Sequence, residues 1–161
     1  MDEIEIKFKS THKYAQLPIS NSAKSNPIGF NAGVKISNGT GDSGYDLFSV
    51  EDVKIYAHKS AVVSIGLTLA YITPGYWFRI EGRSGLGFKH SIQPHFGIID
   101  NLYRGDLGVK LYNLSDVSYD VKAGDRVAQL VVYKLYEPKL GWADEVSTTS
   151  RGASGFGSSG K

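Results

Sequence analysis

The chain has 161 residues, 41% hydrophobic and 21% charged, a composition typical of one soluble domain with a sizeable core. Its formal net charge of +2 gives no reason to expect nucleic-acid binding, and the absence of cysteine excludes disulfides and thiolate zinc sites. No apolar run approaches the ~20 residues of a membrane span, and the charged N-terminal sequence MDEIEIKFKS is unlike a secretion signal. We therefore expect a cytoplasmic protein, encoded by a cell or by a virus, with no membrane association.

Alternation of apolar and polar residues dominates the chain and predicts β-strands. The first alternating run is EIEIKFK, with Ile4, Ile6 and Phe8 on one face. Later runs rich in Val, Ile, Tyr and Phe cover residues 53–56, 61–72, 76–81, 107–114 and 126–136. The turn sequences TPGY, YRGD and KAGD bound several of these runs. The pattern predicts an all-β sandwich or barrel, with one short helix around residues 84–90.

Two segments lack the strand pattern. Residues 20–40 are dominated by Ser, Asn and Gly, which predicts a long surface loop. The chain ends on RGASGFGSSGK, where Phe156 is the only bulky apolar side chain and four glycines make ordering costly. We expect one β domain over residues 1–146 and a flexible glycine-rich arm over residues 147–161 that closes over a site.

Two glycine-containing stretches flank predicted strands, and only the second is by itself a candidate for binding phosphate. In GDSGYDLFS, Asp46 follows a tight turn, and alone it indicates no more than a turn with a capping carboxylate. In EGRSGLGFKHS, glycines surround Arg83 and Ser84, so that backbone amides, a hydroxyl and a guanidinium are available to an anion. An ordinary glycine-rich turn explains the second stretch equally well.

Two further stretches carry candidate catalytic and binding groups. In FGIIDNLYRGDLG, a buried run delivers Asp100, a possible general base for water, with Tyr103 close behind. The alternative is an aspartate that satisfies turn amides and a tyrosine that packs on its hairpin. In KAGDRVAQLVV, Gln129 interrupts an apolar strand, either as an outward-facing side chain or as an amide donor to an anion. The four histidines show no metal-ligand spacing.

Five stretches taken together resemble the five motifs of the trimeric dUTPases. They are GDSGYDL, GRSGLGFKHSI, GIIDNLYRGDLGVKLYN, GDRVAQLVV and RGASGFGSSG, in that order between residues 41 and 160. The resemblance implies a jelly-roll-like, distorted β-barrel, a homotrimer with shared active sites, and Mg2+-dependent hydrolysis of dUTP to dUMP and pyrophosphate. That activity would limit uracil incorporation into DNA and supply dUMP for thymidylate synthesis.

The resemblance also implies a role for individual residues of the catalytic hairpin. Asp100 would orient the attacking water and bond the sugar 3′-OH, while Tyr103 would pack under the deoxyribose and exclude a 2′-OH. Backbone groups near Gly97, Ile99 and Gly108 would read the uracil edge.

Phosphate and metal contacts are implied in the same way. Arg83, Ser84, Gly85 and Gln129 would hold phosphates, and Asp46 would contact the water shell of a Mg2+ ion carried mainly by the triphosphate. The substrate contacts implied for the arm are uracil stacking by Phe156, terminal-phosphate pairing by Arg151, and binding by Gly157 and Ser158.

Departures from the family pattern and competing functions stay open at this stage. The sequence IQPHF replaces the usual small residues before the hairpin, which places His95 either at the nucleotide or at the trimer centre. A dCTP deaminase of the same fold would need a carboxylate to activate water at the base, and would not need a Phe-bearing arm. A nucleotide-dependent regulatory or binding protein is the third possibility. The hairpin sequence and Asp100 favour dUTP hydrolysis.

Overall fold

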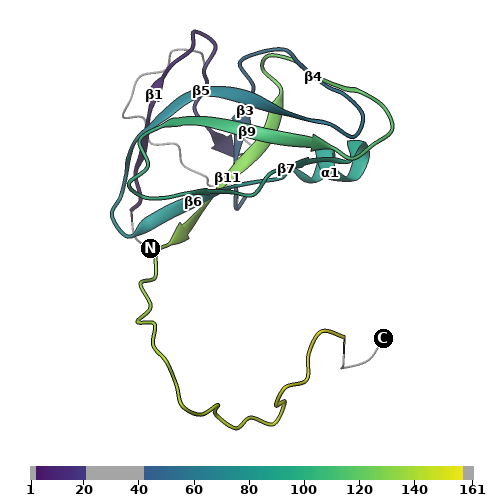
Figure 1. The fold of residues 1–161 in the computed structure, drawn as a ribbon. Coiled ribbons are helices and arrows are strands. Elements are labelled where there is room, and N and C mark those ends of the chain that lie inside the picture. The colour runs from purple at the N-terminus through teal and green to yellow at the C-terminus, as the bar shows by residue number, and fades with distance from the viewer. Residues whose placement is uncertain (1–2, 21–41, 158–161) are drawn as a thin grey trace.

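The computed structural model describes residues 3–20 and 42–157. These residues form eleven strands and one short helix (Figure 1). In chain order they are β1 (Ile6–Ser10), β2 (Ile19–Ser20), β3 (Tyr45–Phe48), β4 (Val53–Ile55), β5 (Ser60–Ile72), β6 (Tyr76–Glu81), α1 (Ser84–His90), β7 (Ile92–Pro94), β8 (Gly97–Ile99), β9 (Asp106–Asn113), β10 (Tyr119–Val121) and β11 (Arg126–Lys134). The predicted helix at residues 84–90 is confirmed. Beyond Ser20, the predicted loop at residues 20–40 lies outside the described residues.

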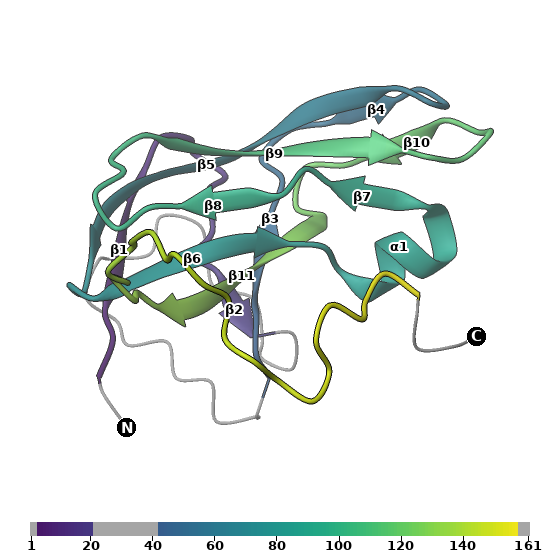
Figure 2. The ribbon, with the colours of Figure 1, turned by 60° about the horizontal axis from the view of Figure 1, so that its bottom comes forward.

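The strands are arranged in three antiparallel sheets. One sheet has the order β1-β5-β9-β7, the second β2-β3-β11-β6-β8, and β10 pairs with β4 in a short ribbon. The two larger sheets face one another and enclose the core (Figure 2). The predicted all-β, jelly-roll-like fold is confirmed, and the described strands form open sheets without a closed barrel.

The core follows from the alternation seen in the sequence. In β9 the inward residues Leu107, Val109 and Leu111 are each at most 2% exposed, while their neighbours face outward. The next inward residue, Asn113, is a buried amide whose Nδ2 donates to Ile55 O and Val117 O at 2.9 and 2.8 Å. Because its polar atoms are satisfied, this residue ties the β9–β10 loop to β4 without a burial penalty.

Strand β11 brings distant motifs together. It pairs with β3 on one side and β6 on the other, so that Gln129 lies opposite both Asp46 and Glu81. Helix α1 starts directly after β6, with Arg83 as its extended N-terminal flanking residue. Figure 2 shows α1 at one end of the molecule and the carboxyl end of β8 toward the other.

The chain leaves the β domain after β11. The amide of Leu135 donates to Gly75 O at 2.8 Å, and every residue from 135 to 154 is exposed. Figure 1 shows this segment extending away from the sheets. Its larger apolar side chains, Leu140, Trp142 and Val146, have no covering surface within the described chain. The predicted boundary between domain and arm at residue 147 stays a prediction. In the described residues we find no helix long and apolar enough to span a membrane.

Candidate active site

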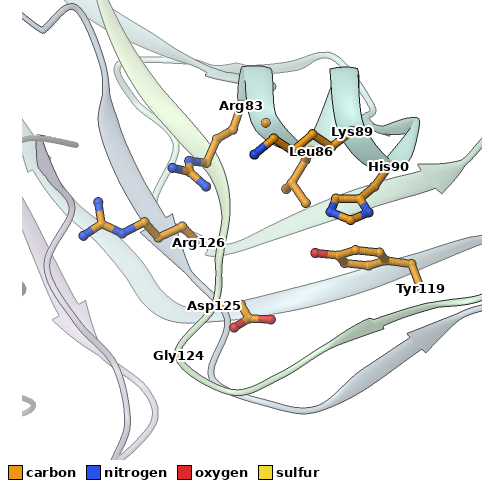
Figure 3. Close-up of a pocket in the computed structure, with 9 residues that line it drawn as sticks. Arg83, Leu86, Lys89, His90, Tyr119, Gly124, Asp125 and Arg126 are labelled. Atoms are coloured by element: carbon orange, nitrogen blue, oxygen red, sulfur yellow. The ribbon is translucent and has the colours of Figure 1, made fainter.

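A cavity of about 450 Å³ lies between α1 and the turn that leads into β11 (Figure 3). We call it the cationic cavity, because Arg83, Lys89 and Arg126 line it together with His90. The remaining lining residues are Gly85, Leu86, Tyr119, Gly124 and the single carboxylate, Asp125. Three permanent positive charges around one hollow suit a ligand that carries several negative charges.

Asp46 holds the two arginines of this cavity in place. Its side chain is only 4% exposed, its Oδ1 accepts from Arg83 Nε at 3.0 Å, and its Oδ2 accepts from Arg126 Nη1 at 2.6 Å. The Arg126 guanidinium also lies over the Phe48 ring, 5.3 Å from its centroid. One buried carboxylate therefore offsets the repulsion between two guanidinium groups and fixes their positions. The metal-shell role expected of Asp46 stays a prediction.

Gln129 braces the junction between β6 and α1. Its Nε2 donates to Gly82 O at 2.8 Å, immediately before Arg83. The Oε1 side of its carboxamide lies against Gly44, where any Cβ would overlap Gln129 Oε1. The glycine of the first motif is therefore explained by the glutamine of the fourth. Phosphate binding by Gln129 stays a prediction.

The start of α1 supplies the remaining residues of the predicted phosphate cradle. Ser84 and Gly85 are exposed in its first turn, and Gly85 lines the cationic cavity. Nothing lies within 4 Å of the position that a Cβ on Gly85 would take, so its backbone is open to a ligand.

The β8–β9 connection that carries Asp100 is rigidly held; it was predicted as a hairpin, and we keep the name hairpin for it although β8 and β9 pair with other strands. Asn101 Nδ2 donates to Thr73 O at 3.0 Å and to Tyr76 O at 2.8 Å, which ties the hairpin turn to the β5–β6 turn. Arg104 Nη1 donates back to the carbonyls of Asn101 and Tyr103, each at 2.7 Å. These four hydrogen bonds fix the backbone on the carboxyl side of Asp100.

Tyr103 is fixed by the same hairpin. Its hydroxyl donates to Asp106 O at 2.7 Å, and its ring lies against Gly105, where a Cβ would overlap the phenol. Tyr103 is 40% exposed, and its expected packing under the deoxyribose stays a prediction. Gly105 is thus required by the orientation of Tyr103.

The backbone positions expected to read uracil lie in β8 and β9. These two strands belong to different sheets and do not pair with each other, so the hairpin predicted over residues 96–108 is a connection between the sheets. Gly97 and Ile99 are in β8, which pairs with β6, and Gly108 is in β9, which pairs with Ser64 of β5. Both glycines let a neighbouring side chain pack closely against the backbone. An added Cβ would lie 3.1 Å from Ile80 Cβ at Gly97 and 3.2 Å from Val62 Cγ1 at Gly108.

Asp100 and the cationic cavity are far apart within one chain. Asp100 lines a second cavity of about 630 Å³, with Trp77, Ile98, Asn101, Leu102, Lys134, Leu135 and Tyr136. In the β6–β8 register Ile99 faces Phe78, so Asp100 follows next to Trp77, six positions before Arg83. At ~3.3 Å per strand residue, the two backbones are roughly 20 Å apart. One chain therefore does not unite the predicted base with the predicted phosphate cradle.

The arm also lies away from both cavities. Arg151 Nε donates to Ser154 O at 2.6 Å within a local turn, and Phe156 is fully exposed. Gly152 and Gly157 have φ values of 58° and 89°, which glycine tolerates better than other residues. Ser158 lies outside the described residues.

Several residues of the cationic cavity were missed by sequence reasoning. Arg126 stands in GDRVAQ three residues before Gln129, and its proximity to Asp46 depends on strand register. Tyr119 comes from the unremarkable stretch SDVSYDV, and burial and the Asp125 carboxylate raise the pKa of its phenol, partly opposed by Arg83. His95 was expected at the nucleotide or the trimer centre. Its Nδ1 lies 3.2 Å from Tyr112 Oη on an exposed face, and it lines neither cavity.

Comparison with known proteins agrees with this geometry. The dUTPase family model matches residues 34–160. The chain belongs to the dUTPase family. Among its relatives is the deoxyuridine 5′-triphosphate nucleotidohydrolase of Solanum lycopersicum, 45% identical over 118 residues, which cover 73% of this chain and 69% of the relative.

Solved structures of dUTPases share the fold. A mutant of the Staphylococcus bacteriophage 80alpha dUTPase, solved with dUpNHpp, is 26% identical with a TM-score of 0.79, and the match covers 100% of both chains. A mutant dUTPase of the Staphylococcus aureus phage phi11 is 22% identical with a TM-score of 0.70, over 91% of this chain and 100% of that chain. That phi11 structure reveals the coordination of a structural Mg(II) ion.

Proposed function

We propose that this protein hydrolyses dUTP to dUMP and pyrophosphate. The observation that carries the proposal is the cationic cavity of a dUTPase-family chain, in which buried Asp46 aligns Arg83 and Arg126 beside the glycine-rich start of α1. Fixed guanidinium groups stabilise the negative charge that develops on phosphate oxygens, and they need no rearrangement during the reaction. In a cell, this reaction limits uracil incorporation into DNA and supplies dUMP for thymidylate synthesis, which implies an intracellular location.

Each part of the hairpin then has a task. Asp100 takes the proton of the attacking water and bonds the sugar 3′-OH, with its backbone held by Asn101. Tyr103 packs under the deoxyribose. Its hydroxyl donates to Asp106 O, which holds the ring where it would clash with a 2′-OH. Backbone groups at Gly97, Ile99 and Gly108 read uracil, and their fixed donor and acceptor pattern rejects cytosine.

The active site is proposed to be shared among three copies of the chain. The roughly 20 Å between the backbones of Asp100 and Arg83 separates base and cradle within one copy. The uncovered arm supports the same conclusion, because Trp142 and Phe156 are fully exposed unless another copy covers them. A homotrimer supplies the hairpin from one copy, the cationic cavity from a second and the arm from a third. Arg151 and Phe156, with Gly157 and Ser158, then close over the terminal phosphates and the base.

Mg2+ fits this site as a companion of the substrate. The described residues contain no group of three His, Asp or Glu side chains able to hold a metal ion. The Asp46 carboxylate faces two arginines, which leaves Asp125 as the carboxylate on the cavity wall. Triphosphate oxygens would therefore provide most of the ligands, with Asp46 or Asp125 reaching only the ion's water shell. When bound, Mg2+ neutralises part of the phosphate charge.

One experiment separates this activity from its rivals. The protein is incubated with Mg2+ and either dUTP, dCTP or UTP, and pyrophosphate, ammonia and bound nucleotide are measured. Release of pyrophosphate from dUTP, with kcat/KM about 10⁴-fold or more above that for dCTP, is expected, and UTP should be poor because of Tyr103. Ammonia from dCTP would instead establish a deaminase, and tight dUTP binding without turnover would establish a binding protein.

A further inference from the structure

The cationic cavity continues beyond the residues that the family resemblance assigns to phosphate. Its far wall consists of Lys89 and His90 from the last turn of α1 and Tyr119 from β10. The His90 and Tyr119 rings lie 5.0 Å apart with an interplanar angle of 54°. In Figure 3 the Tyr119 hydroxyl points toward the middle of the cavity, on the side where Leu86 and Asp125 lie.

The Tyr119 hydroxyl is held in position and is available to donate a hydrogen bond to a ligand. Its ring is positioned by the pairing of Tyr119 with Ile55 in the β4–β10 ribbon and by contact with His90. Within residues 3–20 and 42–157, the hydroxyl has no hydrogen-bond partner. Burial and Asp125 raise the pKa of the phenol, so the proton stays on the oxygen at neutral pH. Such a hydroxyl, in a cavity lined by three permanent cations, suits a phosphate oxygen.

The one carboxylate on the cavity wall does not prevent anion binding. Asp125 Oδ2 accepts from the Lys122 amide at 2.9 Å, which ties this side chain to its own turn. Three cationic side chains line the same cavity, those of Arg83, Lys89 and Arg126. The balance of charge in the cavity is therefore positive.

We propose that Tyr119, together with Lys89 and His90, forms a subsite for the terminal phosphate of the bound nucleoside triphosphate and for the pyrophosphate product. The subsite rests on the proposed dUTP hydrolysis, which places the phosphate chain in this cavity. Arg83 and Arg126 would hold the phosphate chain near the start of α1, and Lys89 and His90 lie in the last turn of that helix, so the phosphates farthest from the nucleoside would reach the aromatic wall. The subsite therefore distinguishes triphosphate and pyrophosphate from dUMP.

The decisive variant is Tyr119→Phe, which removes the hydroxyl and keeps the ring against His90. Tyr56→Phe is the matched control, because Tyr56 lies just beyond the end of β4, is 62% exposed and lines neither cavity. Binding of a non-hydrolysable dUTP analogue, dUMP and inorganic pyrophosphate is measured by calorimetry with Mg2+ present. We expect Tyr119→Phe to weaken the analogue and pyrophosphate about tenfold, as for one hydrogen bond to a charged group, and to leave dUMP within twofold.

The outcomes are separable. Analogue and pyrophosphate affinities within twofold of the control would overturn the subsite, and so would an equal loss for dUMP, which would place Tyr119 at the nucleoside. A wild-type protein that fails to hydrolyse dUTP refutes the proposed function without deciding the subsite, because pyrophosphate alone still reports on it. In that case a tenfold loss of pyrophosphate affinity in Tyr119→Phe supports the subsite, and no loss overturns it.

Discussion

Replacing Asp46 by Asn tests whether one buried carboxylate organises the cationic cavity. The Asp46 side chain is 4% exposed, while those of Arg83 and Arg126 are 26% and 25% exposed. Removing one partner from a buried ion pair costs about 3–5 kcal/mol. Asn keeps the shape and one acceptor oxygen, and both arginines retain access to water, so we expect a loss of about 2–3 kcal/mol. At ~2–4 °C per kcal/mol for a chain of this size, the apo Tm should fall by about 4–12 °C.

The same change should weaken substrate binding. Without the carboxylate, the two guanidinium groups repel one another and lose their fixed orientation, so KM for dUTP should rise by about tenfold or more. If Asp46 acts mainly through the water shell of Mg2+, the Mg2+ concentration for half-maximal rate should rise instead, with little change in Tm.

Both readouts have a matched control. Asp120→Asn removes an exposed carboxylate that lies 3.7 Å from Lys54, and such surface pairs contribute about 0–1 kcal/mol. Thermal unfolding is compared at one protein concentration, because the proposed trimer would make Tm depend on concentration. Asp46→Asn melting within 2 °C of Asp120→Asn, with unchanged KM, would refute the organising role.

Three further predictions concern the base, the arm and a glycine. Asp100→Asn should lower kcat about 10²–10⁴-fold and leave dUTP-analogue binding nearly unchanged, and near-normal turnover would exclude Asp100 as the base. Deleting residues 150–161 should cut dUTP hydrolysis but shift the apo Tm by less than ~2 °C, since this segment adds no core; a large Tm loss would make it structural. Gly44→Ala should displace the Gln129 side chain from Gly82 and raise KM for dUTP several-fold, whereas unchanged kinetics would show that the brace has no effect on the cradle.

Much of the fold was predictable because strand alternation records which residues face the core. The run at residues 107–114 predicted β9, whose inward residues are buried as expected. The three-residue strands β7 and β8 were not predicted separately, because a period of two cannot be established over three positions. Helix α1 was predicted only weakly, since it has one buried residue, Leu86, and no side-chain N-cap.

The candidate site was predictable where a short stretch contains the whole feature. Arg83, Ser84 and Gly85 are adjacent in the sequence, and so are Asp100 and Tyr103. The contact of Asp46 with Arg83 and Arg126 was not predictable, because it joins β3, β11 and the start of α1 through the register of β11. A bulge between Arg126 and Ala128 also shifts that register, and no local pattern records it. Tyr119 was missed for the same reason, since only the fold places β10 across from α1.

Asn101 offers the sharpest test of how the fold positions Asp100, the proposed base. Asn101→Asp keeps the size of the side chain but removes the amide that donates to Thr73 O and Tyr76 O. A carboxylate there faces two carbonyl oxygens, so the hairpin turn should shift and carry Asp100 with it. A displacement of about 1 Å at a reacting group can cost ~10²-fold in rate.

The pH dependence and the choice of kinetic constant separate this role from simple loss of structure. A new negative charge beside Asp100 disfavours its ionised form, so the acidic limb of the kcat profile should move to higher pH. The phosphate cradle of the shared site is proposed to come from another copy of the chain, so its contacts do not depend on this turn, and KM for dUTP should change less than kcat. Asn101→Ala removes the same donors without adding charge, and it should lower kcat without moving the limb. Equal losses in kcat and KM for both variants would mean that Asn101 supports the fold as a whole. A limb that stays in place in Asn101→Asp would mean that the side chain at position 101 does not act on the Asp100 carboxylate.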